Sequence, residues 1–299
     1  MPVVNLSYII ATYNRLPFLK ITLEKLISEL QPDEEIVVID GDSIDGTKNY
    51  LQELFNTGKI QRFISEPDKN QAQAWNKAML LANGIILKKV IDDDVFCYES
   101  IRKCKAYMLD HPDVDVVISD DLAALLNDNA AIEKRTRLPQ FEKWRNGLIA
   151  SFSFSDVNIL IRRSALSYIG LYNTSFTMMD WEYSLRISYL KTNIVYFTGY
   201  NSLTVAHAQT VTSSTNKKSL TNEGDKGAIL YNYLGDNSET SNWSKVKIFI
   251  GKLVYERNKL VPPIINNPDE KSIGVIYDYY YTYINALNQS GSFVFLGQD

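Results

Sequence analysis

Three consecutive carboxylates, Asp92, Asp93 and Asp94, follow an apolar run that ends at Ile91. Like charges at this spacing repel one another, and burying them without a counterion is costly. The cluster therefore predicts a cation at the end of a strand. Carboxylate oxygens are hard ligands that suit Mg²⁺ or Mn²⁺, and such ions usually take their remaining ligands from water and substrate phosphates. A solvated acidic turn is the alternative that these three residues alone leave open.

Polar side chains also follow other apolar runs in the first half of the chain. They are residues 12–15 (TYNR), 40–42 (DGD) and 66–68 (EPD). In open α/β sheets, ligands bind at the carboxyl ends of the strands. A tyrosine can stack on a base, and a carboxylate can accept hydrogen bonds from ribose or base. Because neither common glycine-rich phosphate loop is present, a metal held by the acid cluster would have to neutralise a pyrophosphate. The clusters together predict a nucleotide-diphosphate pocket.

The elements that must position these residues alternate regularly. Apolar runs predict strands over residues 3–11, 35–39, 60–64, 85–91 and 114–119. Apolar residues at three-and-four spacing predict helices over residues 17–30, 47–56, 71–82 and 98–110. This rhythm predicts an α/β fold with a mostly parallel central sheet, right-handed crossovers and flanking helices.

The pattern is weaker in the second half, and it predicts no detail for residues 120–155. Further on it predicts strands over residues 157–161, 195–197 and 203–207, and helices over residues 164–169 and 180–191. Residues 209–222 are rich in Ser and Thr, which predicts a loop. A basic helical pattern over residues 243–260 and a Tyr-rich helix over residues 276–287 predict a helical C-terminal extension.

Composition narrows the class of protein. The 299 residues suffice for one large α/β domain or two, and 45% of them are hydrophobic, enough for a sizeable core. The net charge of −4 argues against nucleic-acid binding through a basic surface. Cys97 and Cys104 form neither a metal pattern nor a disulfide framework, which favours a reducing, cytoplasmic setting. No signal peptide or transmembrane helix is expected.

In combination, the polar clusters resemble motifs of the family 2 glycosyltransferases, which have the GT-A (Rossmann-like) fold. Residues 7–15 (SYIIATYNR) look like the family's opening strand, and residues 39–47 (IDGDSIDGT) resemble its second-strand motif. Residues 66–71 with 75–78 are similar to its next loop and helix. Residues 91–94 (IDDD) stand where the family has its DxD metal motif. This resemblance runs from residue 3 to about residue 120.

The resemblance returns later in the chain. Residues 158–166 and 170–172 look like the family's acceptor-side segment, and residues 179–186 (MDWEYSLR) resemble its Glu-Asp motif. Met179 replaces the usual glutamate, and Asp180 takes the position of the catalytic base. His207 matches a histidine that approaches the metal or the pyrophosphate in related enzymes. Beyond about residue 220 no specific resemblance is found.

The resemblance implies an inverting, metal-dependent enzyme that moves a sugar from a nucleotide-diphosphate sugar, by expectation a UDP-sugar, to a hydroxyl of a glycan or lipid-linked acceptor. Asp180 would deprotonate that hydroxyl while the metal stabilises the departing diphosphate. Bacterial surface-polysaccharide synthesis is the implied setting. The residues implied to bind the nucleotide sugar are Ala11, Thr12, Tyr13, Arg15, Asp40, Asp42, Asp68, Gln71, Asp92 and Asp93. Those implied to bind Mn²⁺ or Mg²⁺ are Asp92, Asp94 and His207.

The implied domain organisation divides the chain at residue 220. Residues 1–220 form a GT-A catalytic domain, with a nucleotide-sugar-binding half over 1–120 and an acceptor-binding half over 121–220. Residues 221–299 form the helical extension. Its basic segment, 243–260, can lie on an anionic membrane surface at the inner face or pack back on the domain. Apolar residues on several sides of the segment favour packing.

Two other functions remain open at this point. A catalytically inactive nucleotide-sugar-binding scaffold is disfavoured, because both the acid cluster and the candidate base are present. A sugar-phosphate nucleotidyltransferase would normally have a Gly-rich, basic N-terminal loop, which the region around Arg15 lacks. The sugar, the acceptor, the linkage and the formation of a homo-oligomer are left open.

Overall fold

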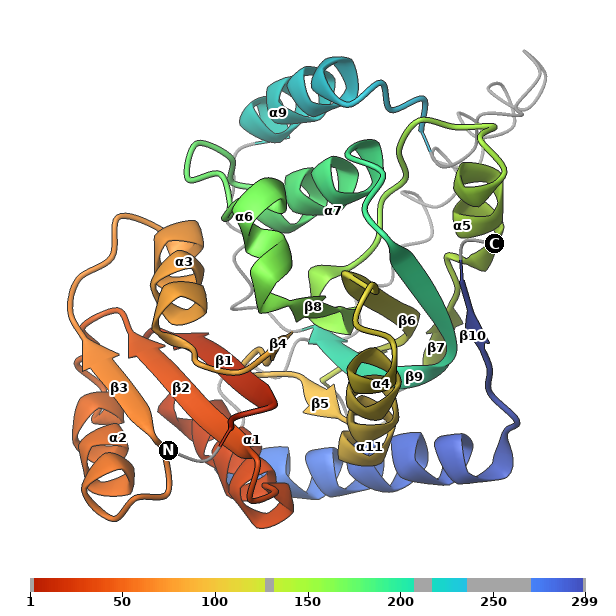
Figure 1. The fold of residues 1–299 in the computed structure, drawn as a ribbon. Coiled ribbons are helices and arrows are strands. Elements are labelled where there is room, and N and C mark those ends of the chain that lie inside the picture. The colour runs from red at the N-terminus through yellow and green to blue at the C-terminus, as the bar shows by residue number, and fades with distance from the viewer. Residues whose placement is uncertain (1–2, 127–131, 207–216, 236–269, 298–299) are drawn as a thin grey trace, which may run out of the picture.

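The computed structural model describes residues 3–126, 132–206, 217–235 and 270–297. Its central sheet has the strand order β10-β9-β6-β8-β4-β1-β2-β3 (Figure 1). The strands are β1 Leu6–Thr12, β2 Glu34–Asp40, β3 Arg62–Ser65, β4 Ile86–Lys89, β5 Val95–Phe96, β6 Val116–Leu125, β7 Glu133–Arg135, β8 Leu160–Arg162, β9 Ile194–Ala206 and β10 Phe295–Leu296. The α-helices are α1 Leu16–Glu29, α2 Thr47–Asn56, α3 Gln71–Leu81, α4 Tyr98–Asp110, α5 Leu138–Arg145, α6 Leu166–Ile169, α7 Met179–Tyr189, α9 Lys217–Leu230 and α11 Glu270–Ser290. The described residues also form two 3₁₀ turns, η1 Asp156–Asn158 and η2 Arg163–Ala165.

The first half of the sheet is parallel, as the alternation of strands and helices predicts. β1 lies between β2 and β4 and is parallel to both, and β3 extends the sheet beside β2. Thr12 pairs with Asp40 at the end of β1 and β2, and Ile9 pairs with Lys89 at the end of β4. The carboxyl ends of these strands therefore meet at one edge, and the polar clusters of the sequence follow them.

The second half of the sheet is mixed. β8 is antiparallel to both β4 and β6, whereas β6 and β9 are parallel over most of their length. The sequence predicted two separate strands over residues 195–197 and 203–207. This separation is wrong, because residues 194–206 form the single strand β9. Its polar middle stays in the sheet because Asn201 and Ser202 hydrogen-bond to buried Asn158.

Alternating side chains of the central strands build a core on each face of the sheet. Tyr8 and Ile10 of β1 pack in a cluster with α1, α2, α4 and α11. Ile9, between them, packs in a second cluster with α3, α5, α6 and α7. Both faces are therefore covered, and the site edge stays open.

The C-terminal residues return to the sheet. Tyr277, Tyr280 and Ile284 of α11 are fully buried in the first core, and β10 pairs antiparallel with β9. Figure 1 shows α11 running along the bottom of the view, below β5 and β9 and with one end at α1. The division of the chain at residue 220 stays a prediction. What the structure adds is that this part of the extension belongs to the same sheet and core as the first residues.

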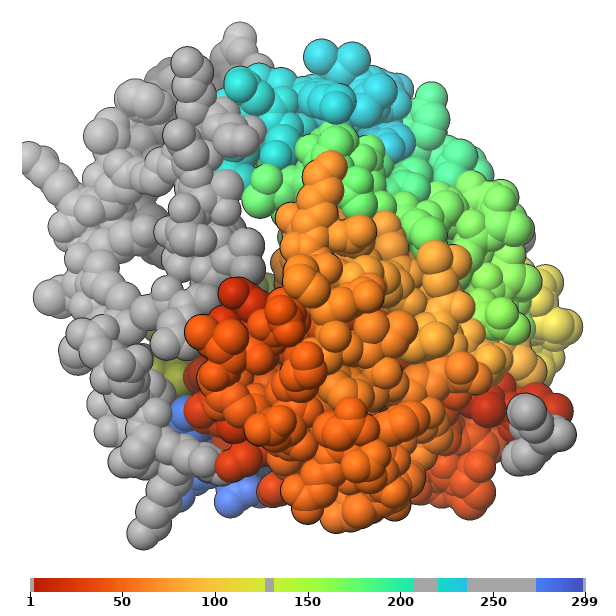
Figure 2. Space-filling view, turned by 90° about the vertical axis from the view of Figure 1, so that its left-hand side faces the viewer, coloured from red at the N-terminus to blue at the C-terminus, as the bar shows by residue number. Residues whose placement is uncertain are grey.

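Residues 217–222, predicted as part of a loop, instead begin α9, so that prediction is wrong there. The helix is stabilised by tertiary contacts, which commonly outweigh a polar composition. Gly227 lies against the indole of Trp181, so closely that a Cβ would come within 2.4 Å of the ring. Figure 2 shows α9 at the top of the molecule, above the segment that contains α6 and α7.

Among the helices that the structure describes, none has the length and apolar character needed to cross a bilayer. The basic segment 243–260 lies outside the described residues, and so does His207.

Candidate active site

The acid cluster lies in a loop between β4 and β5, and its carboxylates have different partners. Thr12 Oγ1 donates to Asp92 Oδ2 at 2.6 Å. Arg15 Nη1 lies 3.2 Å from Asp92 Oδ1 and 2.5 Å from Asp93 Oδ2. Asp94 Oδ1 accepts from the backbone N–H of Val205 at 2.8 Å. Within the described residues, no ammonium or guanidinium lies in ion-pair distance of Asp94.

The backbone of the same loop is also fixed by side chains. Thr22 of α1 donates to the carbonyl of Asp92 at 2.9 Å. The hydroxyl of Tyr277, from α11, donates to the carbonyl of Asp93. Since β1, α1, β9 and α11 all hold this loop, its three carboxylates are positioned by parts of the chain that are far apart in sequence.

The cluster is electrostatically unfavourable. All three carboxylates are at most 4% exposed. Burial raises the pKa of Asp92 to about 6; the charge of Asp93 also raises it, whereas Arg15 and Thr12 oppose the shift. The pKa of Asp94 is raised well above its ordinary value, chiefly by burial and then by the charge of Asp93. A further cation at this edge would relieve the repulsion.

Two cavities meet at the acid cluster. The larger, of about 800 Å³, lies over the ends of β1 and β2. The smaller, of about 400 Å³, lies between the acid cluster and α7. Arg15, Gln71 and Ile91 line both, so the cavities are neighbours.

The larger cavity contains most of the residues predicted to bind the nucleotide. The residues that line this cavity and are also predicted to bind the nucleotide sugar are Ala11, Thr12, Tyr13, Arg15, Asp42, Asp68, Gln71 and Asp92. Tyr13 is 60% exposed at the cavity, and Gly41 lies against its ring. Asp68 is held by Lys77, whose Nζ lies 2.6 Å from its carboxylate.

Asp40 differs from the other residues predicted to bind the nucleotide. It is fully buried, and its carboxylate accepts hydrogen bonds from Ser43 and, at 2.7 Å, from Ser65. It does not line either cavity described above. The structure therefore gives Asp40 a role in ordering the turn after β2, and its contact with a nucleotide stays a prediction.

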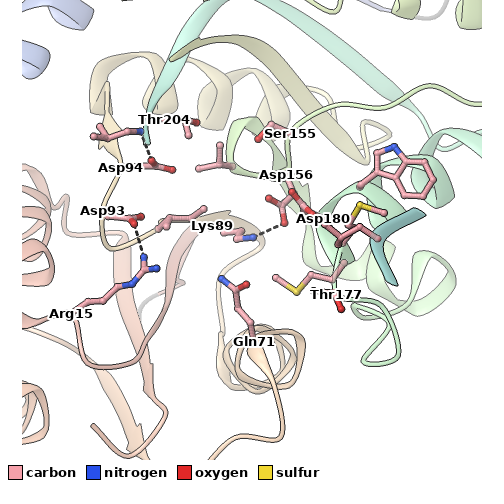
Figure 3. A pocket seen from close by; sticks show the side chains of 17 residues that line it. Arg15, Gln71, Lys89, Asp93, Asp94, Ser155, Asp156, Thr177, Asp180 and Thr204 are labelled. Atoms are coloured by element: carbon pink, nitrogen blue, oxygen red, sulfur yellow. Dashed lines mark hydrogen bonds and ion pairs between the residues drawn. The ribbon is translucent and has the colours of Figure 1, made fainter. Parts of the chain in front are cut away.

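The smaller cavity brings Asp93 and Asp94 together with Asp180 (Figure 3). Asp180 lies in the first turn of α7 and is exposed to this cavity. Its pKa is raised, because the surrounding walls partly desolvate it and the charge of Asp156 repels it; Lys89 acts in the opposite direction. Met179 beside it is 3% exposed and provides no charge. A carboxylate with a raised pKa in a cavity is a reasonable general base.

The beginning of α7 is capped from another helix. The side chain of Met178, the N-cap residue, makes no capping hydrogen bond. Instead, one carboxylate oxygen of Glu223, in α9, accepts from the backbone N–H groups of Thr177 at 2.8 Å and Met178 at 2.9 Å. This contact holds the turn that carries Asp180.

Sequence reasoning missed a buried ion pair in the smaller cavity. Lys89 Nζ lies 2.6 Å from Asp156 Oδ2, and both side chains are at most 4% exposed. Tyr172 donates to the same oxygen at 2.7 Å. A signal did exist, because Lys88 and Lys89 interrupt an apolar strand, and a buried lysine needs a partner. That partner could not be identified from the sequence.

The predicted metal ligands stay a prediction. Asp92 and Asp94 lie together at the sheet edge, whereas His207 lies outside the described residues. Within those residues, no three His, Cys, Asp or Glu side chains are arranged as a metal-binding group. The oxygen donors nevertheless suit Mg²⁺ or Mn²⁺, which protein sites often hold through one or two carboxylates plus substrate phosphates.

Comparison with known proteins identifies relatives over much of the chain. A glycosyltransferase of Mycobacterium bovis BCG, named for PGL/p-HBAD biosynthesis, is 26% identical over 184 residues, which is 60% of this chain and 68% of that protein. The poly-β-1,6-N-acetyl-D-glucosamine synthase of Staphylococcus epidermidis is 23% identical over 64% of this chain and 48% of its own length.

Solved structures share the fold. TarS 1–349 of S. aureus, in complex with UDP-GlcNAc, superposes with a TM-score of 0.59 at 17% identity, covering 79% of this chain and 73% of that one. The Pyrobaculum calidifontis mannosyltransferase PcManGT, in complex with GDP-Man and Mn²⁺, gives a TM-score of 0.56 at 14% identity, covering 97% and 88%. The GT-A fold expected from the sequence is confirmed.

The family model for glycosyl transferase family 2 matches residues 7–170, more than half of the chain. Its match spans the parallel strands, the acid cluster and the segment that contains Asp156. The chain belongs to glycosyl transferase family 2, and it is a glycosyltransferase with the GT-A fold.

Proposed function

We propose that this chain transfers a sugar, with inversion at the anomeric carbon, from a UDP-sugar to a hydroxyl of a glycan or lipid-linked acceptor. The observation that carries the proposal is the pair of adjoining cavities with the acid cluster between them. The larger cavity suits the nucleoside, since Tyr13 offers a ring for stacking and Asp42 and Asp68 offer acceptors for ribose or base. The smaller cavity suits the sugar and the attacking hydroxyl.

Asp180 is the proposed general base. It faces the smaller cavity, across from Asp93 and Asp94 in Figure 3. An inverting transfer needs the acceptor oxygen and the leaving diphosphate on opposite sides of the anomeric carbon. With the diphosphate at the acid cluster, Asp180 is placed to remove the proton of an acceptor hydroxyl on the other side.

Asp92 and Asp94 are the proposed ligands of Mn²⁺ or Mg²⁺, with His207 as the third. Asp94 fits this role well, because it is buried and its hydrogen-bond donor among the described residues is the backbone N–H of Val205. When bound, such a metal neutralises the charge that develops on the departing diphosphate. Arg15, already beside the cluster, adds a second positive charge near the phosphates.

The experiment that tests this function is a donor screen. The intact chain is incubated with UDP- and GDP-sugars, with and without Mn²⁺, and we measure the nucleoside diphosphate released as the sugar passes to water, which stands in for the unidentified acceptor hydroxyl. Release that depends on the donor sugar and the metal is expected, and excess EDTA should abolish it. Full activity in EDTA would contradict the metal role. Tight binding of a nucleotide sugar without release under any condition would instead favour a non-catalytic scaffold.

The setting is proposed from the relatives alone. One relative is named as a polysaccharide synthase and another for the biosynthesis of PGL/p-HBAD. We infer a role in surface-polysaccharide or glycolipid assembly at the cytoplasmic face of a bacterial membrane. Co-sedimentation of the intact chain with anionic vesicles at low salt tests the membrane contact, and a chain that stays in the supernatant would contradict it.

A further inference from the structure

Asp156 is a buried carboxylate with one oxygen occupied and one available. Oδ2 accepts from Lys89 at 2.6 Å and from Tyr172 at 2.7 Å. Among the described residues, no hydrogen bond or ion pair reaches Oδ1. Asp156 and Lys89 both line the smaller cavity. The carboxylate is therefore held in one orientation by its Oδ2 contacts.

The surroundings fix this orientation firmly. Lys89 Nζ lies 4.5 Å from the centre of the Trp75 ring and 5.4 Å from that of Tyr172, so aromatic faces enclose the ammonium. The neighbouring Lys88 donates to the carbonyl of Val157. Two consecutive lysines of β4 thus contact two consecutive residues of the η1 turn.

The place of Asp156 in the cavity indicates what it would contact. Figure 3 shows the Lys89–Asp156 pair between the acid cluster and Asp180. Under the proposed function, the leaving diphosphate lies at the acid cluster and the acceptor hydroxyl lies at Asp180. The donor sugar would then lie between them, and Asp156 lines this cavity with its side chain 3% exposed.

Charge decides which sugar fits. The described lining of the smaller cavity has four carboxylates, Asp93, Asp94, Asp156 and Asp180, and two basic side chains, Arg15 and Lys89. A carboxylate accepts hydrogen bonds and donates none, so its partner must be a hydroxyl or an N–H group. The charge of a bound Mn²⁺ is offset by that of the donor diphosphate, so the lining keeps more negative than positive charges. An acidic sugar would add one more negative charge.

We propose that Asp156, positioned by Lys89 and Tyr172, hydrogen-bonds a hydroxyl of the donor sugar through Oδ1 and selects a neutral sugar with that hydroxyl in the matching configuration. This inference rests on the proposed function. Asp156 is then a specificity-determining residue, whereas Lys89 and Tyr172 are positioning residues. The Lys89–Asp156 pair connects β4 of the nucleotide-binding half to η1 of the other half. Binding of the sugar therefore depends on the relative position of both halves.

The test is calorimetry without acceptor, in the presence of Mn²⁺, on the full chain. The probes are UDP, UDP-glucose, its epimer UDP-galactose, UDP-GlcNAc, GDP-mannose and the acidic UDP-glucuronate. For the parent chain, one neutral nucleotide sugar should bind more tightly than its epimer. UDP-glucuronate should bind more weakly than UDP-glucose by about ten-fold, the size of one lost charge-assisted hydrogen bond. Tighter binding of UDP-glucuronate would overturn the choice of a neutral sugar.

Asp156→Asn keeps the shape of the side chain and removes its charge. UDP should bind as to the parent, while the preferred nucleotide sugar loses about ten-fold in affinity and the difference between epimers shrinks. Tyr172→Phe should move the same quantities in the same direction by a smaller factor. It removes one hydrogen bond and keeps the ring, so it carries the test if Asp156→Asn does not fold.

Lys105→Met is the matched control for Lys89→Met. Lys105 is also a buried lysine, 8% exposed, with Nζ 2.7 Å from Glu34, but it lines neither cavity. Lys89→Met should weaken the binding of the nucleotide sugar and leave the binding of UDP unchanged. Lys105→Met should change the affinity for neither ligand. Equal weakening of both ligands by Asp156→Asn, or no change in either, would overturn the inference. Failure of the parent to bind any UDP or GDP probe would instead overturn the proposed function.

Discussion

Asp180 is the residue on which the proposed chemistry depends most directly. Asp180→Asn keeps the size of the side chain and removes its basicity. We expect turnover to fall by about 10²–10⁴-fold, the usual contribution of a general base. The affinity for the donor should change little, because the nucleotide is proposed to bind in the neighbouring, larger cavity. Single-turnover release of nucleoside diphosphate and calorimetry with the donor measure the two quantities. Near-normal turnover would place the base elsewhere.

The rise of turnover with pH on the acid side of the profile, the acid limb, tests the surroundings of Asp180. The base must be ionised, so turnover rises with pH through its pKa. Since that pKa is raised by desolvation and by Asp156, the limb should lie above the value of about 3.9 for free aspartate. Asp156→Asn removes a negative neighbour and should shift the limb to lower pH. Lys89→Met removes a positive neighbour and should shift it to higher pH.

Opposite shifts of these two variants are the decisive observation, measured as turnover against pH at saturating donor and Mn²⁺. If both variants moved the limb in the same direction, the titrating group would not be Asp180. A merely structural role of the Lys89–Asp156 pair would change the amplitude of the profile and leave the midpoint in place.

At the scale of elements, α11 supports the acid cluster from the side of the sheet opposite α3. The Tyr277 hydroxyl, fully buried, donates to the carbonyl of Asp93. Tyr277→Phe leaves that buried carbonyl without this donor, which should lower the free energy of unfolding by about 1–3 kcal/mol. It should also weaken the binding of UDP with Mn²⁺, because the loop that carries Asp92 and Asp94 loses a support.

Tyr279→Phe on the same helix is the control, since Tyr279 is 54% exposed. Chemical denaturation and calorimetry should show no change for this variant. If Tyr277→Phe lowered stability without changing the affinity for UDP and Mn²⁺, the hydroxyl would serve the core alone.

The cap of α7 belongs to the same scale. Glu223→Ala removes the acceptor of two backbone N–H groups in the turn just before the helix, and each such hydrogen bond contributes about 0.5–1.5 kcal/mol. Turnover should fall while donor KM stays constant, because the turn that carries Asp180 loosens. Glu223→Gln should restore part of the rate, since its amide oxygen still accepts. Asp225→Ala, exposed on the same helix, is the control. A change in KM alone would contradict this role.

In the whole molecule, the candidate site lies where the parallel half of the sheet meets its mixed half. Segments that follow the parallel strands β1 to β4 line the larger cavity, and the segment from η1 to α7 contributes one wall of the smaller cavity. A donor bound with metal should contact both halves and stabilise the complete fold.

Thermal denaturation tests this expectation without any turnover. UDP with Mn²⁺, at about 100 times its Kd, should stabilise the folded state by about 2.7 kcal/mol, seen as a rise in Tm. UDP in EDTA should give a smaller rise. In Asp94→Asn the difference between the two conditions should disappear. An equal rise with and without metal in the parent chain would contradict the proposed metal site.

The sequence by itself determined the parallel half of the fold and the polar clusters that follow its strands. Helices 47–56 and 98–110 have the predicted ends, because the spacing of their apolar residues is a local property of the chain. The clusters around Tyr13, Asp68 and Asp92 meet at one edge because parallel strands with right-handed crossovers must place their carboxyl ends together.

Only the tertiary structure decided which side chains from distant segments meet at this edge. Lys89 and Asp156 are 67 residues apart, Glu223 and Thr177 are 46 apart, and Tyr277 and Asp93 are 184 apart. No local period marks such partners, since each pairing follows from strand order and helix docking. The same reason explains β9, which stays a single strand through a polar stretch because Asn158 satisfies its side chains. Local patterns indicate which residues can form the site, and packing decides which of them support one another.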